Sequence, residues 1–158
     1  MNQVIIYYSV SGHTKAAAAA IHSFTGADIK EIELIKPYSF VGSVTRGLDD
    51  TYRKKIPEIK SEFDLSSYDV IYLGGPTWGY DVNPIIKGFL QEYDLSGKTV
   101  IPFCTDQGAP GKYFEQFSLL CNAAQIDKGH EFIYPKRKSA NELNLEAAHW
   151  LKTLGSRE

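Results

Sequence analysis

Short apolar, β-prone runs recur along the chain, and stretches with helical periodicity separate them. Runs such as Val4–Tyr8 are continuously apolar, which is typical of strands buried on both faces of a sheet. Asp28–Ile35 instead alternates apolar and polar residues, which favours a place nearer a sheet edge. The segments that we predict as strands are Val4–Tyr8, Asp28–Ile35, Asp69–Gly75, Lys98–Cys104 and Gln125–Ile133.

The stretches between these strands carry apolar residues at helical spacing. Ser139 and Glu142 give the last of them the signature of a capping box. The segments that we predict as helices are His13–Phe24, a short one within Ser43–Lys54, Pro84–Tyr93, Gly111–Leu120 and Ser139–Leu154. This alternation of strands and helices predicts a single α/β domain over residues 1–158, with a parallel sheet and helices on both of its faces.

Composition and charge narrow the classes of function. The chain has 158 residues, which suits one domain, and its formal net charge of -2 argues against nucleic-acid binding driven by bulk charge. Cys104 and Cys121 do not form a CxxC pair, so we expect a reducing compartment. The first apolar run is too short for a signal peptide, and no stretch approaches the ~20 apolar residues of a membrane helix. We therefore expect a soluble cytoplasmic protein with no membrane partner and leave its oligomeric state open.

Histidines and basic runs give weaker signals. The 4 histidines lack metal-ligand spacing, so no metal site is expected, and only His13 lies where it could border a ligand. We interpret Arg53-Lys54-Lys55 and Lys136-Arg137-Lys138 as solvated loops. A dock for an acidic partner or for the phosphate of a nicotinamide cofactor is the alternative for these runs.

Glycine- and hydroxyl-rich loops follow three of the predicted strands. In an open parallel α/β sheet, ligands bind beyond the carboxyl ends of the strands, which is where these loops begin. A ligand site is therefore expected among them. The three loops are Ser9–Thr14, Gly75–Asp81 and Thr105–Gly111.

The first loop has the chemistry of a phosphate site. It leads into a helix, whose N-terminal N–H groups and partial positive charge favour an anion. Ser9, Ser11 and Thr14 add hydroxyl donors, and Gly12 permits close approach of the backbone. We expect Lys15 to be the only cation nearby, so that neutral donors hold most of the charge of the anion. The loop has neither the Walker pattern nor the GxGxxG pattern. The alternative interpretation is that these residues only cap the helix.

The first loop has the sequence Ser-x-Ser-Gly-His-Thr between a strand and a helix, and it resembles the phosphate loop of the flavodoxin family. In that family the loop wraps the phosphate of flavin mononucleotide (FMN). The resemblance covers nearly the whole chain. It implies a doubly wound, five-stranded parallel sheet in the order 2-1-3-4-5, in which the three loops converge on one edge. It also implies non-covalent FMN binding, with a first loop formed by Ser9, Val10, Ser11, Gly12, His13 and Thr14.

The second loop contains a tryptophan among glycines at a strand end, which is a poor position for a core residue. An exposed ring at Trp78 would offer a flat face to a planar ligand, and packing of Trp78 against the loop or a partner is the alternative. The resemblance implies that this loop contacts the isoalloxazine ring. It further implies that the peptide Trp78-Gly79 or Gly79-Tyr80 turns toward the flavin when the ring gains a proton. The implied residues are Pro76, Thr77, Trp78, Gly79 and Tyr80.

The third loop resembles the flavin loop whose backbone N–H groups bind the pyrimidine edge of the ring. An ordinary turn at Asp106 and Gln107 is the alternative. Asp81 and Asp106 would oppose the fully reduced, anionic flavin if they point inward. The implied residues are Thr105, Asp106, Gln107, Gly108 and Gly111.

Three functions agree with this interpretation. The first is an FMN electron carrier between redox partner proteins, and it requires no catalytic residue, so we nominate none. The second is a reductase that takes hydride from NAD(P)H and delivers it to a quinone or a similar acceptor. The third is a binding module that keeps the fold without the flavin.

Overall fold

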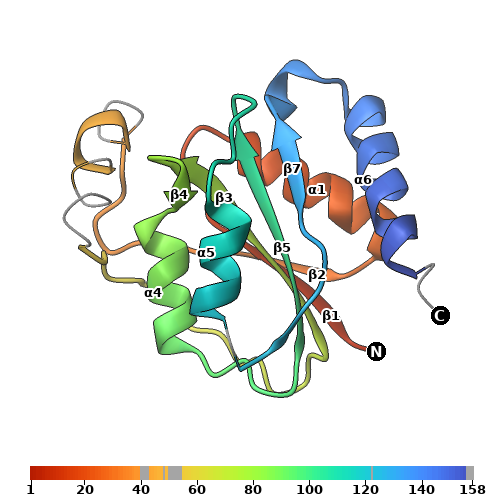
Figure 1. Cartoon of the computed structure of the whole chain (residues 1–158), viewed down its shortest axis with the longest axis horizontal. Coiled ribbons are helices and arrows are strands. Elements are labelled where there is room, and N and C mark those ends of the chain that lie inside the picture. Colours follow the sequence, from red (N-terminus) through yellow and green to blue (C-terminus); the bar gives the residue numbers. More distant parts are fainter. Residues whose placement is uncertain (40–42, 48, 50–54, 122, 156–158) are drawn as a thin grey trace.

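The computed structural model describes residues 1–39, 43–47, 49, 55–121 and 123–155, and a twisted β-sheet runs through its centre (Figure 1). Parallel neighbours follow the order β2-β1-β3-β5, and β6 and β7 both pair with β5. The five positions of the predicted order 2-1-3-4-5 are therefore present. The strands are β1 (Gln3–Tyr7), β2 (Asp28–Glu31), β3 (Val70–Trp78), β4 (Asp81–Val82), β5 (Thr99–Asp106), β6 (Gln125–Ile126) and β7 (His130–Ile133).

The last predicted strand, Gln125–Ile133, is divided in the structure, and Pro102 of β5 gives the reason. The N–H of Asp127 donates to the carbonyl of Val100 at 3.0 Å. In a parallel ladder the carbonyl of Asp127 would then accept a hydrogen bond from the N–H of residue 102. Residue 102 is a proline and has no N–H to donate. The ladder stops there as β6 and resumes as β7 opposite Phe103.

β1 and β5 end within two residues of their predicted ends, whereas β2 and β3 differ more from the prediction. The predicted strand Asp28–Ile35 ends as β2 at Glu31, and Leu34 then forms an antiparallel bridge with Ile59. β2 lies at an edge of the sheet, as its alternating pattern predicts. β3 continues beyond the predicted end at Gly75 and forms an antiparallel hairpin with β4, so the sheet is not purely parallel.

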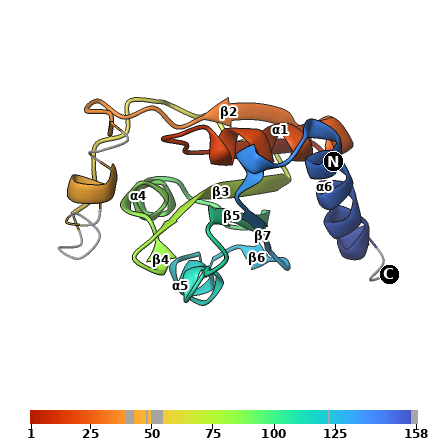
Figure 2. The ribbon, with the colours of Figure 1, turned by 90° about the horizontal axis from the view of Figure 1, so that it is seen from above.

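Helices cover both faces of the sheet, as predicted (Figure 2). Successive residues of β1 point to opposite faces, and both sets are buried: Val4 and Ile6 lie in the core with α4 and α5, and Ile5 and Tyr7 lie in the core with α1 and α6. Burial on both faces explains the continuous apolar runs. The helices are α1 (His13–Thr25), α4 (Pro84–Glu92), α5 (Tyr113–Leu120) and α6 (Ala140–Gly155).

Local signals set the ends of these helices. Gly26 has a φ of 67° and its N–H closes α1 on the carbonyl of His22. The capping box is formed, because the N–H of Glu142 donates to Ser139 Oγ at 3.1 Å and the N–H of Ser139 donates to Glu142 Oε2 at 2.6 Å. The side chain of Asn83 caps the start of α4.

Two short helical segments complete the chain. The helix predicted within Ser43–Lys54 is a short π-helix, η1 (Ser43–Gly47), and residues 48 and 50–54 lie outside the described residues. A 3-10 turn, η2 (Pro135–Arg137), connects β7 to α6.

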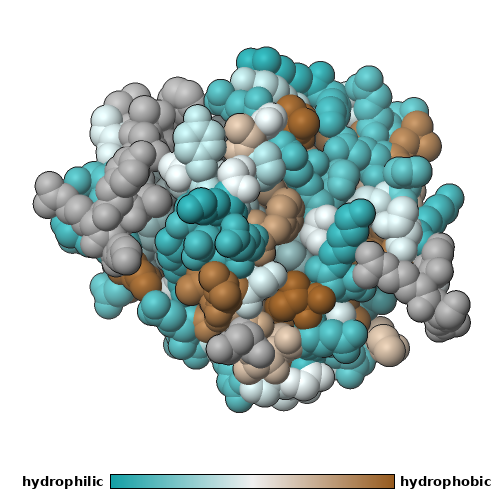
Figure 3. Space-filling model, viewed as in Figure 1, coloured by the Kyte–Doolittle hydropathy of each residue, from teal (hydrophilic) through white to brown (hydrophobic). Residues whose placement is uncertain are grey.

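Among the described residues, no helix combines the length and the apolar character needed to cross a bilayer. Both cysteines are buried free thiols. On the face seen in Figure 3, apolar residues form separate groups among hydrophilic ones. The large apolar side chains that are exposed belong to different elements, such as Phe24 in α1, Leu119 in α5 and Leu145 in α6.

Candidate functional site

A cleft of about 240 Å³ opens at the carboxyl ends of β1, β3 and β5, where the three predicted loops meet. Eleven of the sixteen residues predicted for the site line it, together with Tyr134, which was not predicted. The predicted residues in its lining are Ser9, Val10, Ser11, His13, Thr14, Pro76, Thr77, Trp78, Thr105, Asp106 and Gln107. The predicted residues outside this lining are Gly12, Gly79, Tyr80, Gly108 and Gly111.

The first loop, residues 9–14, is held by its own side chains. Ser9 Oγ accepts hydrogen bonds from the N–H of Gly12 at 3.1 Å and of Lys15 at 3.4 Å. Gly12 has a φ of 90°, in the left-handed region that favours glycine, and α1 begins at the next residue. The N–H groups of His13 and Thr14 lie in the first turn of α1, where an α-helix offers them no intrahelical acceptor. The loop therefore presents donors at the cleft.

A buried pair of hydroxyl groups joins the first loop to the third. Thr14 and Thr105 are 1% and 3% exposed, and their Oγ1 atoms lie 2.8 Å apart. Each hydroxyl satisfies the other in a place that water does not reach. The pair fixes the start of α1 against the end of β5 beneath the cleft.

Trp78 lines the cleft, but the prediction that its ring is exposed was wrong. The residue is 9% exposed, and its ring packs edge-on against Tyr38 and Tyr8, with centroid distances of 5.2 and 6.2 Å. A Cβ built on Gly47 would lie 2.9 Å from the Trp78 ring, so η1 closes over it. The ring is covered by Tyr8, Tyr38 and Gly47, which lie outside the second loop, so the alternative of packing against that loop does not describe the structure either.

The second loop is a tight hairpin turn at Gly79 and Tyr80. Both residues have positive φ angles, 58° and 60°, which is typical of a type I′ turn. The carbonyl of Tyr80 accepts a bond from the N–H of Lys112 at 2.8 Å, and a Cβ at Gly111 would lie 2.5 Å from Tyr80 Cβ. Gly111 therefore serves close contact between the second and third loops and does not line the cleft.

The carboxylate of Asp106 accepts a hydrogen bond from a backbone N–H of the third loop that was expected to bind a ligand. Its Oδ1 accepts the N–H of Gly108 at 2.6 Å, so this N–H is not free for a flavin edge. Asp81, the other carboxylate considered, binds Lys87 at 3.3 Å and does not line the cleft.

Glu131 lies behind Asp106 on the same side of the sheet. It pairs in register with Cys104, whose Sγ lies 3.8 Å from Asp106 Oδ2. Burial raises the pKa of Glu131 to about 7, and a side-chain hydrogen bond with Asp106 and the negative charges of Asp106 and Glu146 raise it further. Negative charge is therefore disfavoured beside this wall of the cleft.

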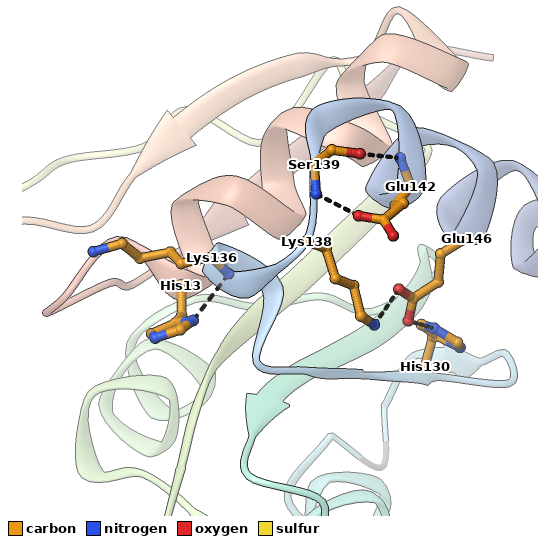
Figure 4. Close-up of polar contacts among 7 residues, drawn as sticks. All are labelled: His13, His130, Lys136, Lys138, Ser139, Glu142 and Glu146. Atoms are coloured by element: carbon orange, nitrogen blue, oxygen red, sulfur yellow. Dashed lines mark hydrogen bonds and ion pairs between the residues drawn. The ribbon is translucent and has the colours of Figure 1, made fainter.

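Two neighbours of the first loop were not predicted from the sequence: Tyr134, and Lys136 of the basic run that we interpreted as a solvated loop. Lys136 Nζ donates to the carbonyl of Ser11 at 2.8 Å. The backbone N–H of Lys136 donates to His13 Nδ1 at 3.2 Å (Figure 4). Burial lowers the pKa of His13, and the positive charges of Lys136 and Arg137 lower it further. The expectation that Lys15 is the only nearby cation was therefore wrong.

Comparison with protein families shows which family this chain belongs to. Residues 2–130 match the family described as flavodoxin. The chain belongs to the flavodoxin family. A search of curated proteins finds no significant match to the chain.

Solved structures share the fold of this chain over most of their length. A candidate flavoprotein from Bacteroides eggerthii is 24% identical, with a TM-score of 0.82 and 99% of each chain covered. A flavoprotein from Lactobacillus acidophilus in complex with FMN is 26% identical, with a TM-score of 0.70 over 82% of this chain and 92% of the other. A flavodoxin from Megasphaera elsdenii is 21% identical, with a TM-score of 0.55 over 93% and 98%.

Proposed function

We propose that this flavodoxin binds FMN non-covalently in the cleft and transfers electrons between redox partner proteins. The observation that carries the proposal is that one cleft combines a hydroxyl-rich helix N-terminus with walls that include an aromatic ring. The similarity to the L. acidophilus flavoprotein, whose structure contains FMN, supports the same ligand here.

The donors of the first loop fit a phosphate group. The first-turn N–H groups of His13 and Thr14 and the positive end of α1 favour an anion. Ser9 Oγ already accepts the N–H of Gly12, which leaves its proton for a phosphate oxygen. The exposed hydroxyl of Ser11 adds another donor.

The other end of the cleft fits a flat ring system. Pro76, Trp78 and Tyr134 contribute largely apolar walls. The volume of about 240 Å³ lies below the roughly 300–1,000 Å³ of enclosed ligand pockets, so we expect an open slot with one side of the ligand accessible. Access to solvent at the ring suits exchange of electrons with a docked protein.

Bound FMN would supply reversible electron transfer. The contribution of the chain is electrostatic, because Asp106 lines the cleft and Glu131 lies behind it. These carboxyl groups oppose additional negative charge on a ligand and thereby favour a lower reduction potential. No side chain needs to act as a nucleophile or as a general acid.

The hairpin turn favours Gly79-Tyr80 over Trp78-Gly79 as the peptide that turns in response to the flavin. Trp78 is held by pairing with Asp81, and the carbonyl of Tyr80 is held by Lys112. A glycine followed by a non-glycine residue suits a type II′ turn, and rotation of the peptide between them converts I′ into II′. This rotation would also release Tyr80 from its positive φ.

Chain length and thiol chemistry bear on the partners and the location. The chain has 158 residues and no obvious insertion that would form a substrate pocket, which favours the carrier over the reductase. The two buried free thiols agree with a reducing compartment such as the cytoplasm.

Reconstitution followed by turnover assays tests the proposal. The purified apoprotein is titrated with FMN, and the loaded protein is then incubated with NADH or NADPH and a series of quinones. We expect a yellow, stoichiometric complex that shows no steady-state consumption of NAD(P)H on its own. Sustained consumption would support the reductase, and a protein that stays colourless would support the flavin-free binding module.

A further inference from the structure

A segment from the end of the chain closes over the first loop, although the two lie far apart in sequence. We call this segment, residues 134–138, the basic arm. Lys136 Nζ donates to the carbonyl of Ser11 at 2.8 Å, across 125 residues of sequence. A Cβ built on Gly12 would lie 3.6 Å from Lys136 Cδ, so the aliphatic stem of Lys136 covers the loop glycine. The arm therefore contacts the loop with both its charge and its carbon chain.

The basic arm is anchored at both of its ends. The N–H of Tyr134 donates to the carbonyl of Asp106 at 3.0 Å, which ties the arm to the third loop. At the other end, Lys138 Nζ binds Glu146 Oε2 at 2.6 Å, and Glu146 also binds His130 (Figure 4). These contacts fix the position from which Lys136 reaches the first loop.

The charges of the arm are not equally available. Glu146 neutralises Lys138, and the guanidinium of Arg137 lies 3.8 Å from the centre of the Tyr134 ring. Among the described residues, Lys136 and Arg137 form no ion pair with a carboxylate, so their positive charge remains uncompensated beside the first loop. The lowered pKa of His13, caused first by burial and then by these two side chains, agrees with a positive potential at this place.

The bond from Lys136 to Ser11 acts on the peptide that joins Ser11 to Gly12. A cation at the carbonyl oxygen withdraws electron density from the peptide and strengthens the bond that the N–H of Gly12 donates to Ser9 Oγ, which holds the loop in shape. The same bond fixes the direction of the Ser11 carbonyl. A phosphate held by this loop would meet a fixed loop with more positive charge than its own residues supply.

We propose that Lys136 is a positioning residue for the phosphate group of FMN and strengthens the preference of this protein for FMN over riboflavin. The inference rests on the proposed function, because it assumes that the first loop receives the phosphate. It adds a contribution from the distant end of the chain that the residues of the loop do not show.

Paired titrations with FMN and riboflavin test this inference. Wild type, Lys136→Met and Lys136→Arg are stripped of flavin and titrated at low salt, with quenching of flavin fluorescence as the readout. Lys136→Met keeps a carbon chain over Gly12 and removes the charge. We expect its Kd for FMN to rise about tenfold and its Kd for riboflavin to change less than about twofold. Lys136→Arg retains most of the FMN affinity, and the difference between Met and wild type shrinks at about 1 M salt.

Lys128→Met is the matched control. Lys128 is exposed and lies before β7, outside the lining of the cleft, so this variant removes an equal charge without touching the first loop. Its Kd for FMN should stay within about twofold of wild type. Thermal melting of each apoprotein establishes that the variants are folded before they are titrated.

The outcomes separate the inference from the function on which it rests. An unchanged FMN affinity in Lys136→Met, or an equal loss for FMN and riboflavin, would overturn the role in phosphate recognition while FMN binding stands. A wild-type protein that binds neither flavin would overturn the proposed function and the inference together.

Discussion

The first loop takes its shape from contacts between residues only 3 and 6 positions apart, because Ser9 Oγ receives the N–H groups of Gly12 and Lys15. The opposite end of the cleft depends on distant segments, since Trp78 packs on Tyr38 and Gly111 packs on Tyr80. The first loop can therefore be altered with little effect on folding, whereas the end of the cleft at Trp78 and Gly111 is part of the core. Substitutions should therefore separate affinity for the ligand from stability.

Truncation of Trp78 should have the largest effect on stability. Trp78→Ala removes a ring that is 9% exposed and packs against Tyr8 and Tyr38, so we expect a loss of about 3–4 kcal/mol. Urea denaturation of the apoprotein, followed by far-UV circular dichroism, measures this loss.

Two alanine substitutions serve as controls for Trp78. Tyr80→Ala lies in the same hairpin at a residue that is 67% exposed, and Ser11→Ala lies at an exposed position of the first loop. Each should change stability by about 0.5 kcal/mol or less. A loss of similar size in all three variants would contradict the difference between the two ends.

A methyl group at Gly111 should also be strongly destabilising. The Cβ of Gly111→Ala would lie 2.5 Å from Tyr80 Cβ and 2.6 Å from the Tyr80 carbonyl oxygen, at a φ of 58°, and we expect a loss of about 3 kcal/mol. Gly97→Ala is the matched control, because Gly97 has a φ of 75° with nothing within 4 Å of its Cβ position. It should lose only about 1 kcal/mol, in the same denaturation assay. Equal losses would show that the contact between the second and third loops is not specific.

The threonine pair that joins the two ends should show coupling. Thr14→Val leaves the buried Thr105 hydroxyl without its partner, and we expect a loss of about 2 kcal/mol. Replacing both threonines with valine removes both polar groups. The loss of stability in the double variant should therefore be smaller than the summed losses of the two single variants, by about 1 kcal/mol. Strict additivity in this double-mutant cycle would argue against the hydrogen bond.

Glu131 should make stability depend on pH. Its pKa is raised from 4.5 to about 7 in the folded protein, so the folded state holds more protons than the unfolded state between these values. Stability should therefore fall as pH rises through this range. Glu131→Gln should remove this pH-dependent loss of stability and leave the protein more stable than wild type above pH 7. The gain should be about 1 kcal/mol or less, because solvent screens the interaction between Glu131 and Asp106. Denaturation at both ends of the range measures the effect, and parallel pH profiles for the two proteins would contradict it.

The order of the sheet and the first loop were predictable because their signals are local or were carried by the resemblance. Apolar runs of a few residues mark the strands, and Gly12 followed by a helix marks the loop. The break between β6 and β7 was also visible in principle, since Pro102 stands inside a predicted strand and lacks the N–H that a ladder requires.

The remaining features depend on pairs of segments that no local pattern connects. Trp78 is covered by η1, which lies in a stretch with little periodicity. Lys136 reaches Ser11 only because η2 folds back over α1, and the run around it resembles any solvated basic loop. Contacts of this kind follow from the tertiary packing.

The central claim, that FMN occupies the cleft with its phosphate at the first loop, is tested most directly by amide NMR of the apoprotein during titration with FMN and, separately, with riboflavin. We predict that FMN shifts the amide signals of residues 11–14 and 105–108 most strongly, and that riboflavin leaves those of residues 11–14 nearly unchanged. FMN-induced shifts that fall elsewhere, or equal shifts of the first loop with both flavins, would contradict the account.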